Sequence, residues 1–246
     1  KFSMRWDDYS NFGDKISPSA SLNFWLFDTI KLHTLAAKSF RTPTFNDLYW
    51  KDPYLQGNPN LGPEKADSFE AGLSGYLFNK IKTDVTFFRT DFRDLLEWVP
   101  GGGIVWSPEN VSSATTKGIE AETEFVVRKH LKANFNYTYL EAENKETEKW
   151  LIYRPRHLYK LKLVYSPTPK WEMGVSTVYK TKRFTNADNT DYLKHSCIAS
   201  LNFGYKIKDN LQVVFEAKNI FDREYQEEKD YPMPGRAFYG GVKLTF

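Results

Sequence analysis

The sequence predicts an all-β protein, more specifically a transmembrane antiparallel β-barrel, and three observations lead to this prediction. Apolar and polar residues alternate along most of the 246-residue chain, as in strands that separate two environments. The connections between these segments are short and long in turn, an asymmetry typical of membrane-spanning barrels. Aromatic residues make up 17% of a chain whose mean hydropathy is -0.58, and barrel walls combine these two properties.

Composition excludes several other classes of protein. No apolar run approaches the roughly 20 residues of a spanning helix, so a closed barrel is the remaining way to cross a membrane. The formal charge is +3 with both signs interspersed, so nucleic-acid binding is not expected. Cys197 is the only cysteine, which excludes an internal disulfide. Because the chain begins at Lys1 without an initiator Met or signal sequence, we expect a processed, trimmed or partial chain.

The alternation predicts about twelve strands, with boundaries uncertain by roughly two to four residues. In the segments near 114–128 and 131–142, one face is mainly apolar or aromatic and the other is polar, so we assign the first to lipid and the second to a lumen. Their polar faces contain Glu120, Glu122 and Glu124, and Lys132, Asn134, Asn136 and Thr138. The expected strands lie near 1–8, 17–27, 30–40, 66–78, 81–97, 114–128, 131–142, 156–166, 171–181, 195–206, 210–220 and 237–246.

The connections predict which end of the barrel faces the exterior. Short turns of outer-membrane barrels are periplasmic and long loops are extracellular, which predicts location in a bacterial outer membrane, with lipid and lipopolysaccharide as partners. Phe246 ends the chain in a way that resembles the C-terminal signal of outer-membrane proteins. Short turns are expected at 28–29, 79–80, 129–130, 167–170 and 208–209, and long loops near 9–16, 41–65, 98–113, 143–155, 182–194 and 221–236.

The expected loop at 41–65 carries a paired motif. It reads AKSFRTPTFNDLY over 37–49 and GNPNLGPE over 57–64, followed by SFEAGL over 68–73. This pair resembles the paired motif of TonB-dependent receptors, although Thr42 stands where the family usually has Ala. KGIE at 117–120 is similar to a strand entry of that family. KNIFDREY at 218–225 and YPMPGR at 231–236 resemble its C-terminal element.

The resemblance extends over the whole chain and implies what the protein does. It implies a barrel of about twenty-two strands, of which residues 1–246 are the C-terminal part, with the plug domain and the first strands absent. It also implies a receptor that binds a ferric siderophore or cobalamin at extracellular loops and imports it with energy from TonB, which the missing N-terminal part would contact. A separate N-terminal fragment is a further expected partner. The residues do not separate the two ligands.

Structural roles are expected for most motif residues. Arg41 and Glu64 are expected to form a bidentate ion pair that pins the long loop. Prolines stiffen this loop by fixing backbone torsions, and asparagines suit its turns. The motif residues are Arg41, Pro43, Asn58, Pro59, Asn60, Leu61, Glu64, Gly235, Arg236 and Phe246.

Aromatic residues of the long loops are the expected ligand contacts, because flat rings stack on a corrin edge, a catechol or a hydrophobic chelate. An interfacial aromatic girdle is the alternative interpretation of these rings. The cations Arg154, Arg156, Lys180, Lys182 and Arg183 would attract an anionic ferric siderophore, or else contact solvent or lipopolysaccharide. The predicted substrate-binding residues are Trp50, Tyr54, Trp98, Trp106, Trp150, Tyr153 and Arg154.

No metal site, cofactor or catalytic residue is expected. Histidines and carboxylates do not cluster with metal-ligand spacing, and Asp188 and Asp191 suit a polar turn better than a calcium site. Haem is disfavoured, because haem receptors of the family carry a His between the motif halves and none lies between Arg41 and Asn58.

Two other functional classes stay open. Some outer-membrane barrels of twelve strands are lipid hydrolases, but the Gly-x-Ser-x-Gly motif is absent and GLSG at 72–75 has the wrong spacing. We therefore expect no enzyme. A passive porin would conduct ions without binding a ligand tightly, and it leaves the paired motif unexplained.

Overall fold

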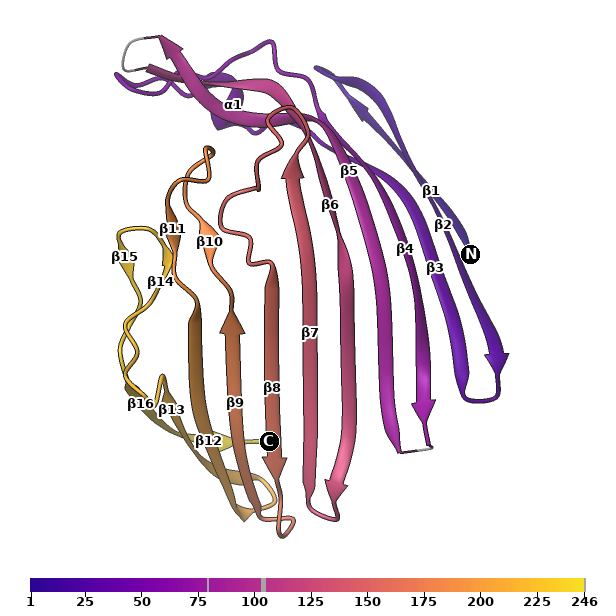
Figure 1. The fold of residues 1–246 in the computed structure, drawn as a ribbon, viewed down its shortest axis with the longest axis vertical. Coiled ribbons are helices and arrows are strands. Elements are labelled where there is room, and N and C mark those ends of the chain that lie inside the picture. The colour runs from indigo at the N-terminus through magenta and orange to yellow at the C-terminus, as the bar shows by residue number, and fades with distance from the viewer. Residues whose placement is uncertain (79, 103–104, 246) are drawn as a thin grey trace.

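A computed structural model describes residues 1–78, 80–102 and 105–245. In these residues, twelve strands form one antiparallel sheet in the order β1-β2-β3-β4-β5-β6-β7-β8-β9-β12-β13-β16. Successive strands are therefore neighbours, as in an up-and-down barrel. The sheet bends into a curved wall that is not closed (Figure 1). Phe246, which the sequence singles out, lies outside the described residues.

The strands of the wall are long because each has to cross a bilayer at a tilt. β5 and β6 are the longest, with 22 and 24 residues. The twelve are β1 (Phe2–Tyr9), β2 (Gly13–Phe27), β3 (Ile30–Arg41), β4 (Glu64–Leu77), β5 (Ile81–Gly102), β6 (Val105–Arg128), β7 (Leu131–Asn144), β8 (His157–Tyr165), β9 (Trp171–Lys180), β12 (Ser196–Lys208), β13 (Leu211–Lys218) and β16 (Ala237–Leu244).

All twelve expected strands are present, but two of the expected long loops are wrong. The 9–16 segment is a tight hairpin, because β1 and β2 stay paired up to Tyr9 and Gly13. The 98–113 segment continues the β5–β6 ladder, in which Trp98 pairs with Pro108 and Pro100 with Trp106. This segment contains Pro100, Gly101, Gly102 and Pro108, residues that are uncommon inside strands. The ladder instead absorbs them through register shifts at 92–96 and 100–102.

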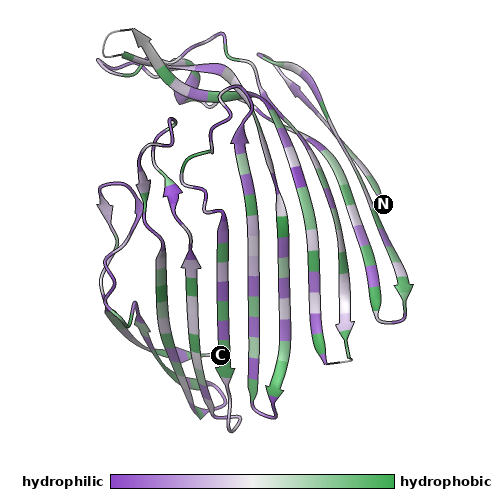
Figure 2. Ribbon diagram, in the orientation of Figure 1, coloured by the Kyte–Doolittle hydropathy of each residue, from purple (hydrophilic) through white to green (hydrophobic). Residues whose placement is uncertain are grey.

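Register places the polar residues of neighbouring strands in rows on one face. Asp84, Glu122, Asn136 and Lys160 face one another across β5, β6, β7 and β8. The first three of them, together with Lys82, Glu124 and Asn134, line a hollow of about 380 Å³. Lys160 lines a smaller hollow with Glu122 and Asn136. The polar face is therefore the concave one. The alternation is visible as purple and green bands along each strand in Figure 2.

The other face is a band of exposed apolar side chains. Leu163, Val175, Leu201, Ala217 and Phe238 form one row across five strands, and Val175, Leu201 and Phe238 are exposed. Such a continuous surface is unfavourable in water and favourable in hydrocarbon. In the described chain the buried apolar residues are mostly small alanines, so the wall depends on lipid instead of a packed core.

Short elements decorate the rim that carries the long connections (Figure 1). They are α1 (Phe45–Tyr49) and two small hairpins, β10 (Arg183–Phe184) with β11 (Tyr192–Leu193) and β14 (Gln226–Glu228) with β15 (Tyr231–Pro232). The sequence patterns did not predict α1. It is held by a capping box in which Thr44 and Asp47 exchange hydrogen bonds. No helix of the described residues is long and apolar enough to cross a membrane.

Adjacent positions of β9 provide a matched test of the two faces. We expect Val175→Lys on the apolar face to destabilise the barrel by about 2–4 kcal/mol, the cost of a Lys near the bilayer midplane. Ser176→Lys on the polar face should cost less than about 1 kcal/mol. Urea-induced unfolding of the receptor in lipid bilayers measures both. Equal destabilisation by the two variants would contradict the assignment of the faces.

Candidate functional site

The segment 42–63 is fixed at its base by the expected ion pair. Arg41, at the end of β3, donates from Nε and from a terminal nitrogen to Glu64, at the start of β4, at 2.5 and 2.8 Å. The same carboxylate accepts the Leu96 N–H at 2.8 Å. Glu64 thereby joins both ends of the segment to β5, in a bidentate geometry that gives orientational specificity.

The segment is also fastened along its length to the extended β5–β6 hairpin. Asn58 donates from its amide to the Pro108 carbonyl at 3.1 Å and accepts the Asn60 N–H at 2.9 Å, which is an Asx turn. Asn110 exchanges two hydrogen bonds with the Gly62 backbone, at 2.7 and 3.0 Å. Leu61 and Pro43 are buried in this junction. The motif residues thus build a rigid support.

Two predicted ligand contacts lie on this support. An Asp52 carboxylate accepts the Trp50 indole N–H at 2.8 Å and the Tyr54 and Leu55 N–H groups at 2.7 Å. These donors hold the pKa of Asp52 below its usual range. Trp106 exchanges backbone hydrogen bonds with Tyr54 and Gln56.

The side chains of Trp50, Tyr54 and Trp106 are all exposed at the rim. Trp98 lies within β5, where it is half-buried, and not in a loop as expected.

Two other predicted contacts, Trp150 and Arg154, line one hollow, which we call the cation–aromatic cavity. It has a volume of about 350 Å³ and lies where the 145–156 loop approaches β10. The Arg156 guanidinium lies over the Trp150 ring at 4.4 Å from its centroid, and Lys182 lies over Phe184 at 5.2 Å. The lining residues are Leu140, Ala142, Trp150, Leu151, Arg154, Arg156, His157, Thr181, Lys182 and Phe184.

The charge of this cavity is one-sided, because three cations and no carboxylate line it. Glu141 approaches Arg156 only at 3.7 Å. Tyr153 lies beside the cavity in a left-handed conformation with φ of 57°, and its N–H donates to the Phe184 carbonyl at 2.8 Å. A site with this lining favours an anionic ligand that carries flat rings.

Two of the five expected cations do not contribute to this cavity. Lys180 and Arg183 both donate to Glu227 of β14, at 2.7 and 2.6 Å. The Arg183 side chain is 3% exposed. Both are therefore structural, because they attach the 221–236 segment to β9 and β10. Burial raises the pKa of Glu227, but the hydrogen bonds from Lys180 and Arg183 outweigh this effect and leave it below the usual value.

Asp191, which the sequence analysis weighed as a calcium ligand, forms a second contact between the 182–194 and 221–236 segments. Asp191 forms an ion pair with Lys229, accepts the Tyr192 N–H at 2.9 Å and has a lowered pKa for these reasons. Within the described ranges no group of three or more possible metal ligands occurs. Asp191 itself contacts the Lys229 side chain and the Tyr192 backbone N–H.

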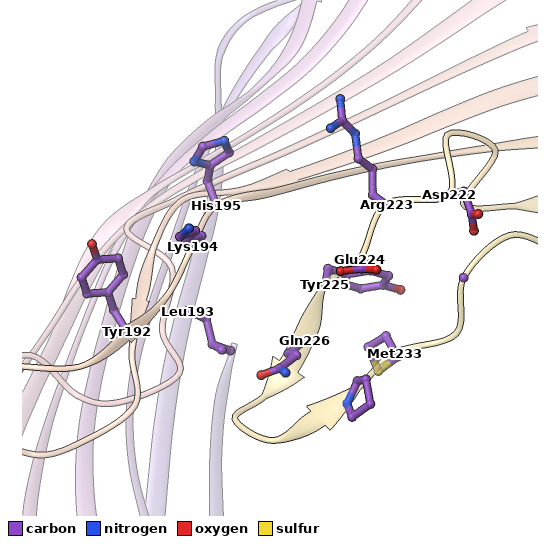
Figure 3. Close-up of a pocket in the computed structure, with 12 residues that line it drawn as sticks. Tyr192, Leu193, Lys194, His195, Asp222, Arg223, Glu224, Tyr225, Gln226 and Met233 are labelled. Carbon is purple, nitrogen blue, oxygen red and sulfur yellow. The ribbon is translucent and has the colours of Figure 1, made fainter.

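Another hollow, of about 670 Å³, lies between residues 192–195 and the 222–235 loop. Figure 3 shows Tyr192, Lys194 and His195 on one side and Arg223, Glu224 and Met233 on the other. Its cations are mixed with carboxylates, so it selects ligand charge less clearly than the cation–aromatic cavity. Gly235 and Arg236 shape this loop, since the Arg236 N–H donates to Asp222 at 2.7 Å.

Sequence reasoning missed several residues that position the sites. Asn110 supports the 42–63 segment, Glu227 binds two cations, Phe184 lines the cavity and Asn189 contacts Trp150. Asn189, Asn110 and Glu227 make these contacts with residues that are 39 or more positions away in the sequence. Local patterns do not encode such contacts.

Comparison with known proteins identifies relatives of the chain. Residues 2–220 match the family model described as TonB dependent receptor-like, beta-barrel. The vitamin B12 transporter BtuB of Photobacterium profundum is 30% identical over 248 residues, which cover 99% of this chain and 40% of that protein. A ferric enterobactin receptor of Pseudomonas aeruginosa is 25% identical, again over 99% of this chain and 40% of the relative.

Solved structures show the same fold. A ferric enterobactin receptor mutant from Pseudomonas aeruginosa, in complex with enterobactin, superimposes with a TM-score of 0.83 at 24% identity. The match covers all of this chain and 43% of that one. The chain thus spans about two fifths of the length of the relatives that it matches. The expected wall of a larger barrel is confirmed as a fold.

Removal of the Glu64 carboxylate should loosen the 42–63 segment. In Glu64→Gln the bidentate ion pair is lost, and we expect proteolysis within 42–63 to rise roughly fivefold, which corresponds to about 1 kcal/mol of local opening free energy. Lys65→Gln is the matched control, because it removes a neighbouring exposed ion pair with Asp94. Limited proteolysis of the native membrane compares them. An unchanged cleavage rate in Glu64→Gln would show that the Arg41–Glu64 ion pair does not hold the segment in place.

Acidification should release the 221–236 segment. The pKa of Glu227 is lower in the folded protein than its ordinary value of 4.5, so its contribution is complete above that pH and is lost as the pH falls through the folded pKa. A spin label at position 230, with Cys197 replaced by Ser, should be immobile at pH 7 and become mobile as the pH falls through the folded pKa, which lies below 4.5. In Glu227→Gln it should be mobile throughout this range. A pH response that persists in Glu227→Gln would assign the effect to another group.

Proposed function

Because the chain belongs to the TonB-dependent receptor β-barrel family, we propose that it forms the C-terminal part of a receptor that imports a scarce nutrient chelate. The family places it in the outer membrane of Gram-negative bacteria. Its members are receptors and transporters, in agreement with the expectation that the chain is not an enzyme. The proposal concerns the cargo, the energy source and the residues that bind.

The observation that carries the choice of cargo is the lining of the cation–aromatic cavity. Arg154, Arg156 and Lys182 surround the rings of Trp150 and Phe184 without a carboxylate in the lining. Positive charge at a partly enclosed site concentrates anions and speeds their capture. We therefore assign to this site a ferric siderophore with anionic, ring-bearing metal-binding groups.

The exposed rings of Trp50, Tyr54 and Trp106 offer further contacts at the same rim. Trp50 and Tyr54 are carried by the 42–63 segment, whose ion pair and Asx turn keep the rings in place. Rings held in this way lose little conformational entropy when a ligand stacks on them.

Cobalamin is the second candidate cargo. The relative of 30% identity is named as a vitamin B12 transporter, and the exposed rings at the rim suit the edge of a corrin. A cargo without net negative charge would not need the three cations, and this difference separates the two candidates.

Energy coupling to TonB is proposed on the basis of the family assignment. Import against a gradient would require TonB, contacted through a segment outside residues 1–246, and a plug that fills the lumen of the completed barrel. The polar concave face, with Asp84, Glu122 and Lys160 in one row, suits a hydrated lumen. Outer-membrane lipid and lipopolysaccharide would cover the apolar face.

Binding of two probes to outer membranes that contain the receptor tests the proposed cargo. We expect iron-radiolabelled ferric enterobactin to bind, and Arg154→Gln to raise its Kd about tenfold, since a charge-assisted contact contributes roughly 1.5–3 kcal/mol. Lys149→Gln, an exposed cation of the same loop outside the cavity lining, should leave the Kd unchanged. Tight binding of cyanocobalamin alone, insensitive to Arg154→Gln, would favour the second candidate.

A further inference from the structure

Asn189, at the tip of the β10–β11 hairpin, holds the main chain of Trp150. Its side-chain nitrogen donates to the Trp150 carbonyl at 3.0 Å, and its side-chain oxygen accepts the Trp150 N–H at 2.7 Å. One amide thus satisfies both polar groups of one residue, as a neighbouring strand would do. The two residues are 39 positions apart and belong to different loops.

The local backbone leaves Trp150 dependent on this contact. On either side, the Lys149 carbonyl accepts the Asn144 N–H and the Leu151 N–H donates to the Ala142 carbonyl, both at 2.9 Å. Because successive residues of an extended chain direct their polar groups to opposite sides, those of Trp150 face away from β7. Asn189 lies there and pairs them.

The hairpin tip is built to present this side chain. Asn189 has φ of 59°, a left-handed conformation that asparagine tolerates better than most residues. Its N–H donates to the Asn186 carbonyl at 3.1 Å, while the Asn186 side chain accepts the Thr190 and Asp191 N–H groups. A fixed turn thus aims one amide at Trp150.

We infer that Asn189 is a positioning residue for ligand binding: by clasping the Trp150 backbone, it fixes the ring that faces Arg156 in the cation–aromatic cavity. This inference rests on the proposed function of that cavity. The clasp joins the 145–156 loop, which supplies Trp150 and Arg154, to the hairpin that supplies Phe184 beside Lys182. Without it, the two walls of the cavity would keep the hydrogen bond from the Tyr153 N–H to the Phe184 carbonyl but would lose the contact that fixes Trp150, and the binding-competent arrangement would be less populated.

The test uses Asn189→Asp, which keeps the size and the acceptor of the side chain but removes the donor. We expect the Kd of iron-radiolabelled ferric enterobactin for receptor-containing outer membranes to rise about tenfold. Ala187→Asp places the same new charge at an exposed site of the same hairpin and should change the Kd less than about twofold. An equal loss in Ala187→Asp would overturn the inference in favour of a general charge effect.

A double-mutant cycle shows whether Asn189 acts through Trp150. Trp150→Ala should itself weaken binding, and in this background Asn189→Asp should have no further effect. An undiminished effect of Asn189→Asp in the Trp150→Ala background would overturn the inference. If Trp150→Ala weakens binding while Asn189→Asp does not, the clasp fails and the proposed cavity stands.

If Trp150→Ala leaves the binding of both ferric enterobactin and cyanocobalamin unchanged, the cavity assignment fails, and the role of Asn189 fails with it. The amount of folded barrel, measured from the mobility of unheated protein on gels, confirms that each variant assembles. Binding is then expressed per folded receptor, so that a loss of assembly is not read as a loss of affinity.

Discussion

Backbone hydrogen bonding in the absence of water is the constraint on which the rest of the structure depends. A peptide group in hydrocarbon has no solvent partner, so each strand of the wall requires a neighbour on either side. The meander order satisfies this requirement with the strand that is nearest in sequence. Once the ladders exist, the pleat directs alternate side chains to lipid and to the lumen. The row from Leu163 to Phe238 and the row from Asp84 to Lys160 are direct results of this arrangement.

At the rim, water is available and the constraint changes. Side chains, instead of ladders, then determine how the connections pack. Glu64 gathers three donors around one carboxylate, and Glu227 gathers two cations around another. Asparagines are equally prominent: Asn58, Asn110 and Asn189 each join distant segments, because an amide offers a donor and an acceptor together. The rim is a network of specific polar contacts.

The wall was predictable from the sequence because the patterns that mark its strands and turns lie within short stretches of the chain. A period of two residues marks a strand such as β9, and a short polar turn marks its end. The extension of β5 and β6 was not predictable, since Pro100 and Pro108 read as loop residues and only the register shifts of the ladder accommodate them. α1 was also missed, because a helix of five residues gives no periodic signal.

The site was predictable only where a family motif carried the information. Arg41 and Glu64 were paired because both belong to the motif, and the structure contains this pair. Nothing in the sequence indicated that Trp150 and Arg154 line one cavity. Lys180 and Arg183 were expected either to attract the ligand or to contact solvent or lipopolysaccharide, yet Glu227, which pairs with both, lies 47 and 44 residues away. Charge alone could not reveal that these two cations were already occupied.

The division between ladders and rim has an evolutionary consequence. Arg154 and Lys182 line the cation–aromatic cavity and lie outside the twelve strands of the wall. Either residue can therefore be exchanged without disturbing a hydrogen bond of the wall. Cargo preference can therefore diverge rapidly while the barrel is inherited almost unchanged. The slow step in such divergence would be the replacement of residues like Asn189, whose geometry permits few substitutes.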